Sequence, residues 1–194
     1  MQPHFNKLSP DEQKAFRLYK ANTPIAGGHF FADFVNESLR DGRALPDDVN
    51  RDASFLDSII DKAKLDEPTT LYRATVDHFV VPYVSDRVLI YPAYMSTTDE
   101  LVGIERHFSG SLKDIPAALL QIECPKGAVA LDLETNAAFG GHEREYLLPR
   151  GARFLIHGVE EITDTQMMNE RMTPFYAKNY SALKIYRLQY EGRV

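Results

Sequence analysis

The spacing of apolar residues changes once along this chain, near Pro68, and that change limits the folds open to it. Before Pro68, apolar side chains recur at helical spacing within residues 9–22, 29–41 and 52–63. After it, short apolar runs bounded by glycine and proline predict strands. Helices first and strands later indicate an α+β domain rather than an alternating parallel sheet.

The first predicted helix carries its own start signal. Ser9 can cap the helix, Pro10 suits the first helical position, and Glu12 can reach back to the amide of the cap. Pro92 should place a strand end at an edge or a break. We predict strands at 70–75, within 88–95, and at 117–124, 128–133, 144–148, 152–162 and 183–190, with a short helix at 99–108.

The composition sets the class of molecule. A chain of 194 residues, 44% hydrophobic and 26% charged, predicts one packed globular domain. A formal net charge of −6 without any Lys/Arg-rich run argues against electrostatic binding to a nucleic-acid backbone as the main binding mode. A local basic groove stays open as an alternative, because net charge does not report patches.

Metal and membrane signals are missing from the sequence. The single cysteine, Cys124, excludes an intrachain disulfide and a dithiol zinc site, and it reads as a core residue. No HExxH or EF-hand pattern occurs, so we expect no metal cofactor. The N-terminus lacks a secretory signal, and the apolar runs are too short to span a bilayer. We therefore expect no membrane partner and a cytoplasmic site of action.

Two carboxylates stand close together late in the chain. In an extended strand, Glu143 and Glu145 would face the same side, roughly 6.5–7 Å apart along the chain. Such a pair suits acid–base chemistry and the stabilisation of positive charge, although an isolated pair is more typical of a solvated edge strand. The small-residue segment 134–142 precedes them and predicts a surface loop, where substrate contacts often lie.

Two further groups of residues suggest chemistry. Arg73 lies in a predicted strand between Tyr72 and Ala74, where its charge needs an anionic partner. A guanidinium can hold a phosphate through two parallel hydrogen bonds, and a surface ion pair is the alternative. The hydroxyl run 96–98 can cap a turn or hold a carboxylate in one rotamer. Without a G-x-S-x-G pattern, a nucleophilic serine is the poorer interpretation.

The order of these motifs resembles a known family. A strand with Tyr72-Arg73, a strand ending in Ser96-Thr97-Thr98, and a loop leading to Glu-x-Glu before Leu-Leu-Pro-Arg-Gly resemble the arginine–serine–glutamate mono-ADP-ribosyltransferases. That class includes bacterial toxin exoenzymes, phage enzymes and arginine-specific transferases. The resemblance covers roughly residues 19 to 190, and its helical lead-in is matched by Tyr19, Asn36 and Leu39-Arg40.

The resemblance implies a fold. The whole chain, 1–194, would form a single ADP-ribosyltransferase domain, with residues 1–66 as a helical lead-in and 67–194 as a β-rich NAD-binding core. The helices would pack on a mixed, largely antiparallel core of two sheets. The segment 164–179, with three methionines and two aromatic residues, is either a partner-facing insertion or part of the core.

The resemblance also implies residue roles. Arg73 would bind the NAD phosphate and adjoining ribose, and Ser96 would form a hydrogen bond with the catalytic glutamate. Glu145 would bind the ribose 2′-hydroxyl and stabilise the oxocarbenium ion as nicotinamide leaves. A glutamate at Glu143 is similar to arginine-modifying members. Further NAD contacts would be Tyr72, Thr97, Thr98, Arg106 and Phe108, and acceptor contacts Phe139 and His142.

The implied activity is cleavage of NAD, used as a substrate without a metal, and transfer of ADP-ribose to an arginine of a target protein by a monomer. Four alternatives remain. The acceptor could be a nucleic acid or water, the chain could be a non-catalytic binding module, or paired carboxylates could serve a glycoside hydrolase. The absence of tryptophan and the three-part motif disfavour the last of these.

Overall fold

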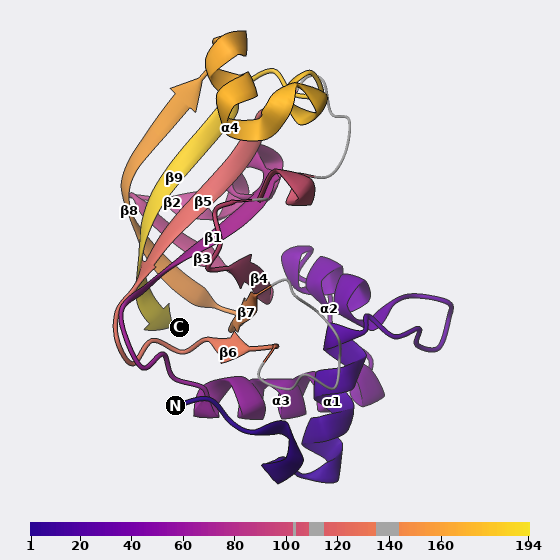
Figure 1. Cartoon of the computed structure of the whole chain (residues 1–194). Coiled ribbons are helices and arrows are strands. Elements are labelled where there is room, and N and C mark those ends of the chain that lie inside the picture. Colours follow the sequence, from indigo (N-terminus) through magenta and orange to yellow (C-terminus); the bar gives the residue numbers. More distant parts are fainter. Residues whose placement is uncertain (103, 109–114, 135–143) are drawn as a thin grey trace.

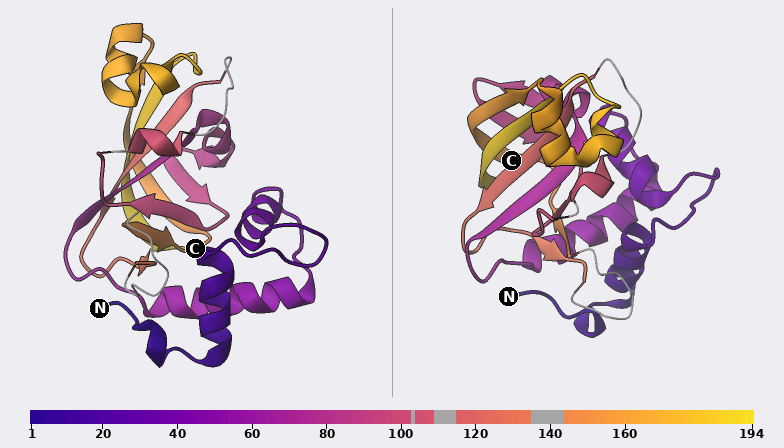
Figure 2. Two further views of the ribbon diagram at one scale, coloured as in Figure 1. Left: turned by 45° about the vertical axis from the view of Figure 1, so that its right-hand side comes forward. Right: turned by 45° about the horizontal axis from the view of Figure 1, so that its top comes forward.

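The computed structural model describes residues 1–102, 104–108, 115–134 and 144–194, with only the backbone of residues 105 and 106. Figure 1 shows α1, α2 and α3 gathered at one end of the strands and α4 at the other, and the two views of Figure 2 agree. The helices are α1 (Pro10–Lys20), α2 (Phe31–Arg40), α3 (Asp47–Lys62) and α4 (Thr165–Ala177), with 3₁₀ turns at Phe5–Lys7, Asp77–Phe79, Val81–Tyr83 and Ile104–His107.

All the strands belong to one mixed sheet with the order β2-β3-β8-β9-β5-β1-β4-β7-β6. Only β5 and β9 run parallel among the named pairs. The strands are β1 (Thr69–Val76), β2 (Val84–Ser85), β3 (Val88–Tyr91), β4 (Met95–Thr98), β5 (Ala117–Cys124), β6 (Leu131–Asp132), β7 (Glu145–Leu148), β8 (Ala152–Ile162) and β9 (Leu183–Arg193).

The α+β class is confirmed, with one correction to the predicted two-sheet core. β1 pairs with β5 along its whole length, but with β4 through the single pair Tyr72↔Thr98. That pair keeps the hydrogen bonding continuous from β1 to β4, so the strands form one sheet and not the two that the resemblance implies. The short strands β4, β7 and β6 therefore extend the main sheet through one narrow join, which brings Thr98 next to Tyr72.

The first helix begins where its capping residues predict. The Ser9 Oγ accepts from the Glu12 amide at 3.3 Å, and the Glu12 carboxylate accepts from the Ser9 amide at 3.0 Å. Glu12 also accepts from Ser58 Oγ at 3.0 Å and from the Lys62 ammonium, both on α3. Burial opposes ionisation, but the bonds from Lys62, Ser9 and Ser58 outweigh it and lower the pKa of Glu12 to about 2. This carboxylate therefore ties α1 to α3.

Several predicted boundaries move. The strand predicted within 88–95 is β3, which ends before Pro92 as expected for a residue that cannot donate to a ladder, and β4 begins at Met95. The predicted strand 128–133 shortens to β6, the predicted helix 99–108 is a short 3₁₀ turn, and α3 begins before residue 52. The segment 164–179 is a helix that Asp164 caps, with a kink at Thr173 (φ 65°). Met168 and Met172 on this helix are buried, which favours the core-packing alternative for the segment.

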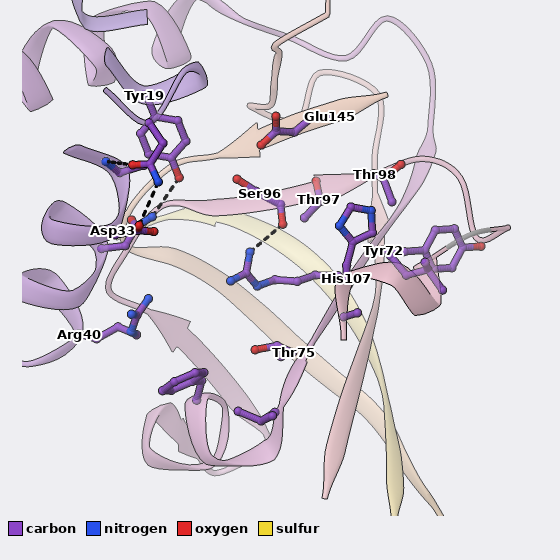
Figure 3. Close-up of a pocket in the computed structure, with 18 of the residues that line it drawn as sticks. Tyr19, Asp33, Arg40, Tyr72, Thr75, Ser96, Thr97, Thr98, His107 and Glu145 are labelled. Carbon is purple, nitrogen blue, oxygen red and sulfur yellow. Dashed lines mark hydrogen bonds between the residues drawn. The ribbon is translucent and has the colours of Figure 1, made fainter. Parts of the chain in front are cut away.

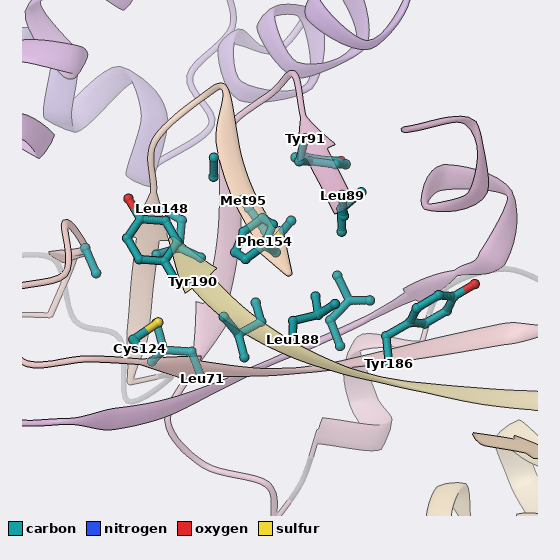
Figure 4. Close-up of a cluster of buried hydrophobic side chains, with 14 of the residues drawn as sticks. Leu71, Leu89, Tyr91, Met95, Cys124, Leu148, Phe154, Tyr186, Leu188 and Tyr190 are labelled. Atoms are coloured by element: carbon teal, nitrogen blue, oxygen red, sulfur yellow. The ribbon is translucent and has the colours of Figure 1, made fainter. Parts of the chain in front are cut away.

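Two clusters of buried side chains hold the site in place. One lies within the sheet and includes Leu71, Met95, Cys124 and Phe154 (Figure 4), and burial raises the pKa of the Cys124 thiol to about 12. The other joins helices to strands and includes Phe16, Phe31, Ile59, Tyr94 and Leu147. Because α1 and α2 pack against β7 through this second cluster, their inner faces and the strand ends border one space.

Candidate active site

A cleft of about 630 Å³ lies between the helical region and the ends of β1, β4 and β7. Such a volume suits a small-molecule ligand. Figure 3 shows Tyr19 and Arg40 entering from the helix side, and Ser96, Thr98 and Glu145 from the strand side. The described residues that line it include Tyr19, Lys20, Asn36, Arg40, Tyr72, Arg73, Thr75, Phe79, Ser96, Thr97, Thr98, His107 and Glu145. The helical region and three strand segments, all far apart in the sequence, therefore meet here.

Arg73 extends from β1 into the cleft. Its Nη1 donates to the Ser96 carbonyl at 2.8 Å, which joins β1 to β4 beside the Tyr72↔Thr98 pair. No carboxylate of the described residues lies within ion-pair distance of this guanidinium, so the surface ion pair considered above does not form among them. Arg73 is partly exposed in the cleft wall, where an anionic ligand can reach it.

The hydroxyl run on β4 serves two purposes. Thr97 Oγ1 donates to the Tyr146 carbonyl at 2.8 Å, and Thr98 Oγ1 accepts from the Glu100 amide at 3.2 Å. These bonds fix β4 against β7 and close the turn after β4, as the turn-capping alternative predicts for Thr98. Ser96 and Tyr19 of α1 line the same cavity. Ser96 therefore faces α1 from the strand side of the cleft.

Glu145 is the first residue of β7 and pairs with Thr98 across the ladder. Its Oε2 accepts from Lys20 Nζ at 2.6 Å, and the same ammonium donates to Glu134 Oε1 at 2.9 Å. Burial opposes the charge of Lys20, but the bonds from Glu145 and Glu134 outweigh it and hold the pKa of Lys20 above its usual range. Lys20 went unpredicted, and its only signal in the sequence is its place beside Tyr19.

The helix side supplies further polar groups. The Tyr19 hydroxyl accepts from Asn36 Nδ2 at 3.0 Å, and Asn36 Oδ1 accepts from the Tyr94 amide at 3.0 Å. Burial raises the pKa of Tyr19 to about 12. Arg40 lies one helical turn after Asn36 on the same face of α2, with its guanidinium 5.1 Å from the centre of the Phe79 ring. The cleft thus has a second cation opposite Arg73.

The other predicted site residues fall into three groups. Tyr72, Thr97 and Thr98 line the cleft. Phe108 does not: it is 4% exposed in a core cluster, with its ring 6.1 Å from that of Tyr180. Its ring packs among the apolar side chains of this cluster, outside the residues that line the cleft. The side chain of Arg106 and the residues Phe139, His142 and Glu143 lie outside the described part of the chain.

The backbone at Arg144 differs from the extended strand predicted over residues 144–148. Arg144 has φ 47°, and the strand begins at Glu145. The strict alternation of side chains therefore starts at Glu145 and does not extend back through Arg144. The Arg144 guanidinium forms ion pairs with Asp99 at 2.5 Å and Glu100 at 3.2 Å, which anchors the start of β7 to the turn after β4.

Neither metal ligation nor a membrane span is indicated by the residues that the structure covers. In those ranges, no three His, Cys, Asp or Glu side chains are grouped as metal ligands would be. No helix within the same ranges has both the length and the apolar character needed to cross a bilayer.

Solved structures with a similar fold define a class, the bacterial ADP-ribosylating toxins. Plx2a from Paenibacillus larvae is 19% identical, with a TM-score of 0.64 over 96% of this chain and 89% of that one. The Clostridium limosum C3 exoenzyme is 17% identical, with a TM-score of 0.63 over 95% and 87%. Exoenzyme S from Pseudomonas aeruginosa is 13% identical, with a TM-score of 0.65 over 94% and 74%.

The amino-acid sequence shows which family the chain belongs to. The model of the ADP-ribosyltransferase exoenzyme family matches residues 2–178, so the chain belongs to this family. The resemblance drawn from the three motifs is thereby confirmed. A comparison with curated protein sequences gives no significant match. Membership of the family supports NAD-dependent transfer of ADP-ribose as the activity of this protein.

Proposed function

We propose that this protein cleaves NAD between nicotinamide and ribose and transfers the ADP-ribose to an arginine side chain of a target protein. The observation that carries the proposal is the meeting of Arg73, Ser96 and Glu145 in one cleft. Structures of similar fold support NAD as the substrate, because Exoenzyme S was solved with Carba-NAD and BECa of Clostridium perfringens with NADH.

The cations of the cleft would hold the dinucleotide. Arg73 on β1 and Arg40 on α2 line the same cavity from opposite sides, and a diphosphate between them would meet both guanidinium groups. The rings of Tyr72 and Phe79 border the cavity and offer apolar faces for the bases. The backbone around Thr97 and Thr98 shapes the floor, and we assign Arg106 to the nicotinamide side.

Glu145 would stabilise the reacting sugar. As the bond between ribose C1′ and the nicotinamide nitrogen breaks, its electron pair leaves with nicotinamide and positive charge develops on the ribose. A carboxylate already in position can stabilise that charge by about 3–4 kcal/mol, by analogy with a single oxyanion-hole donor. The acceptor nitrogen then forms the new bond to C1′.

Glu143 would decide the acceptor, with Phe139 and His142 beside it. A carboxylate can pair with a guanidinium in a two-pronged bond and also accept its proton as the new bond forms. An amide at this position could not accept the proton. We further propose that residues 1–194 act as one monomeric domain in the cytosol of the target cell, with a protein rather than a nucleic acid as acceptor, in keeping with the net charge of −6.

The experiment incubates the protein with labelled NAD and a cell lysate, and measures nicotinamide release and protein labelling. Glu145→Gln should abolish both, because it removes the charge that faces the sugar. Glu143→Gln should lose labelling of arginine and keep some NAD hydrolysis. Glu160→Gln is the matched control, because this carboxylate forms an exposed ion pair with Arg187 on strands β8 and β9.

The chemistry of the label separates the acceptors. A label on protein that hydroxylamine releases supports arginine. Arginine labelling that survives Glu143→Gln would contradict the role given to Glu143. A label that resists hydroxylamine, or that maps to nucleic acid, would favour the alternative acceptors.

A further inference from the structure

Lys20 occupies a position that neither the sequence motifs nor the proposed chemistry requires. It is the last residue of α1, and its side chain is only 8% exposed. The ammonium forms ion pairs with Glu145 at 2.6 Å and with Glu134 at 2.9 Å. A buried ammonium is costly unless it is paired, and these ion pairs stabilise Lys20 at this place.

The place of the ammonium is set by rigid neighbours. Tyr19 is buried, and its ring meets that of Tyr94 edge-on at 5.6 Å between centroids. The end of α1 is therefore packed against the body of the protein, and a cation there is favoured by the helix dipole. On the other side, the Glu134 amide donates to Asp132 Oδ1 at 2.7 Å, which fixes the backbone that carries the second carboxylate.

We infer that Lys20 is a positioning residue for Glu145, and this inference rests on the function proposed above. The ammonium holds Oε2 of Glu145, which fixes the rotamer of the carboxylate and sets the direction of its other oxygen. Glu134 binds the same ammonium and offsets part of its charge. Glu145 thus keeps negative charge for the developing cation on the ribose while its orientation is held.

The competing interpretation is purely structural, in which Lys20 only ties α1 to β7. The two interpretations differ in what they predict for catalysis in a folded enzyme. A tie would affect the thermal midpoint and the activity together. A positioning residue affects kcat more than KM for NAD, because the rotamer of Glu145 matters most when the sugar carries charge.

The test measures nicotinamide release by the full chain, with kcat and KM for NAD determined separately. Lys20→Met should lower kcat about 10- to 100-fold, the range for losing a hydrogen bond to a charged group, with KM within about twofold. Lys14→Met is the matched control: Lys14 is also on α1 and pairs with Asp52 at 2.7 Å, and it is outside the residues that line the cleft. It should keep the wild-type kcat.

Chemical restoration of the charge sharpens the test. Lys20→Cys is treated with 2-bromoethylamine, whose bromide is displaced by the thiolate to leave an ammonium at nearly the length of lysine. Mass spectrometry confirms one added group, and the wild type treated alike controls for the buried Cys124. We expect the treated variant to regain most of kcat. Glu134→Gln should lower kcat severalfold, because Lys20 then neutralises Glu145 more completely.

The possible outcomes distinguish failure of the proposed function from failure of the positioning role of Lys20. A wild type that releases no nicotinamide would overturn the proposed function and this inference with it. An active wild type with an unchanged kcat in Lys20→Met would overturn only the positioning role. Loss of activity that aminoethylation does not restore, together with a lowered thermal midpoint, would show that Lys20 is a structural tie.

Discussion

The two sides of the cleft differ in how the sequence encodes them. The strand side presents Arg73, Ser96 and Glu145, each within a short motif on β1, β4 or β7. The helix side presents Tyr19, Lys20, Asn36 and Arg40 from α1 and α2. Three of these match scattered positions of the helical lead-in of the family, whereas Lys20 matches none. A compact motif therefore marks chemistry carried by neighbouring positions of a strand, whereas the opposite wall is assembled largely by tertiary packing.

The largest expected effect is a loss of NAD affinity, which should differ between the cations on the two sides of the cleft. Arg73→Ala should weaken NAD binding about 100-fold, because a charge-assisted bond near the upper end of its range is lost. Arg40→Ala should weaken it about tenfold, because its guanidinium lies against the Phe79 ring and not on the strand floor. Titration calorimetry with NAD measures both. Equal losses would break the comparison, and no loss in Arg73→Ala would contradict the proposed phosphate contact.

The second prediction concerns the attachment of the helix side at low pH. The pKa of Glu12 is about 2 in the folded protein and near 4.5 otherwise, so its stabilisation is present above pH 4.5 and is lost as the pH falls toward 2. We expect the free energy of unfolding to fall by on the order of 2 kcal/mol over that window from this group. Urea unfolding at several pH values measures it.

The control for the pH prediction is Glu12→Gln, which removes the titrating group but keeps a side chain of similar size. The difference in unfolding free energy between wild type and Glu12→Gln should shrink as the pH is lowered from 6 to 2. A difference that does not depend on pH would show that the bonds of Glu12 to Ser9, Ser58 and Lys62 contribute nothing through its charge.

The smallest effect tests a hydrogen bond on the helix side of the cleft. Tyr19→Phe removes a hydroxyl that accepts from Asn36, and should cost about 1 kcal/mol of unfolding free energy. Because the pKa of Tyr19 is about 12, the pH profile of NAD cleavage between pH 6 and 9 should keep its shape in this variant. A changed shape there would show that Tyr19 itself titrates during catalysis.

The sequence predicts the elements that have local signals, and it misses the features that depend on distant residues. Apolar runs and their turns placed β5 and β8 correctly, and the Ser9 cap placed α1, because these signals are local. The continuity of the sheet depends on the single pair Tyr72↔Thr98, which no local pattern reports. Phe108 was assigned to the cleft because it follows the hydroxyl run, yet its environment is set by Tyr180, distant in the sequence.

Lys20 is the clearest example of a site residue that the sequence alone does not predict. In the sequence it is an ordinary charged residue in the last turn of a helix, where a cation is expected on helix-dipole grounds alone. Its partners Glu134 and Glu145 lie more than a hundred residues away, with separations of 114 and 125. Only folding brings these charges together, so pairing of this kind is visible in the structure and not in the chain.

The most direct test of the central claim measures NAD binding and nicotinamide release on the same preparations of wild type and Glu145→Gln. We expect the wild type to bind NAD and release nicotinamide, whereas Glu145→Gln should bind NAD with similar affinity and release none. Release of nicotinamide by Glu145→Gln at the wild-type rate would contradict the claim, because the carboxylate in this cleft would then have no part in breaking the bond.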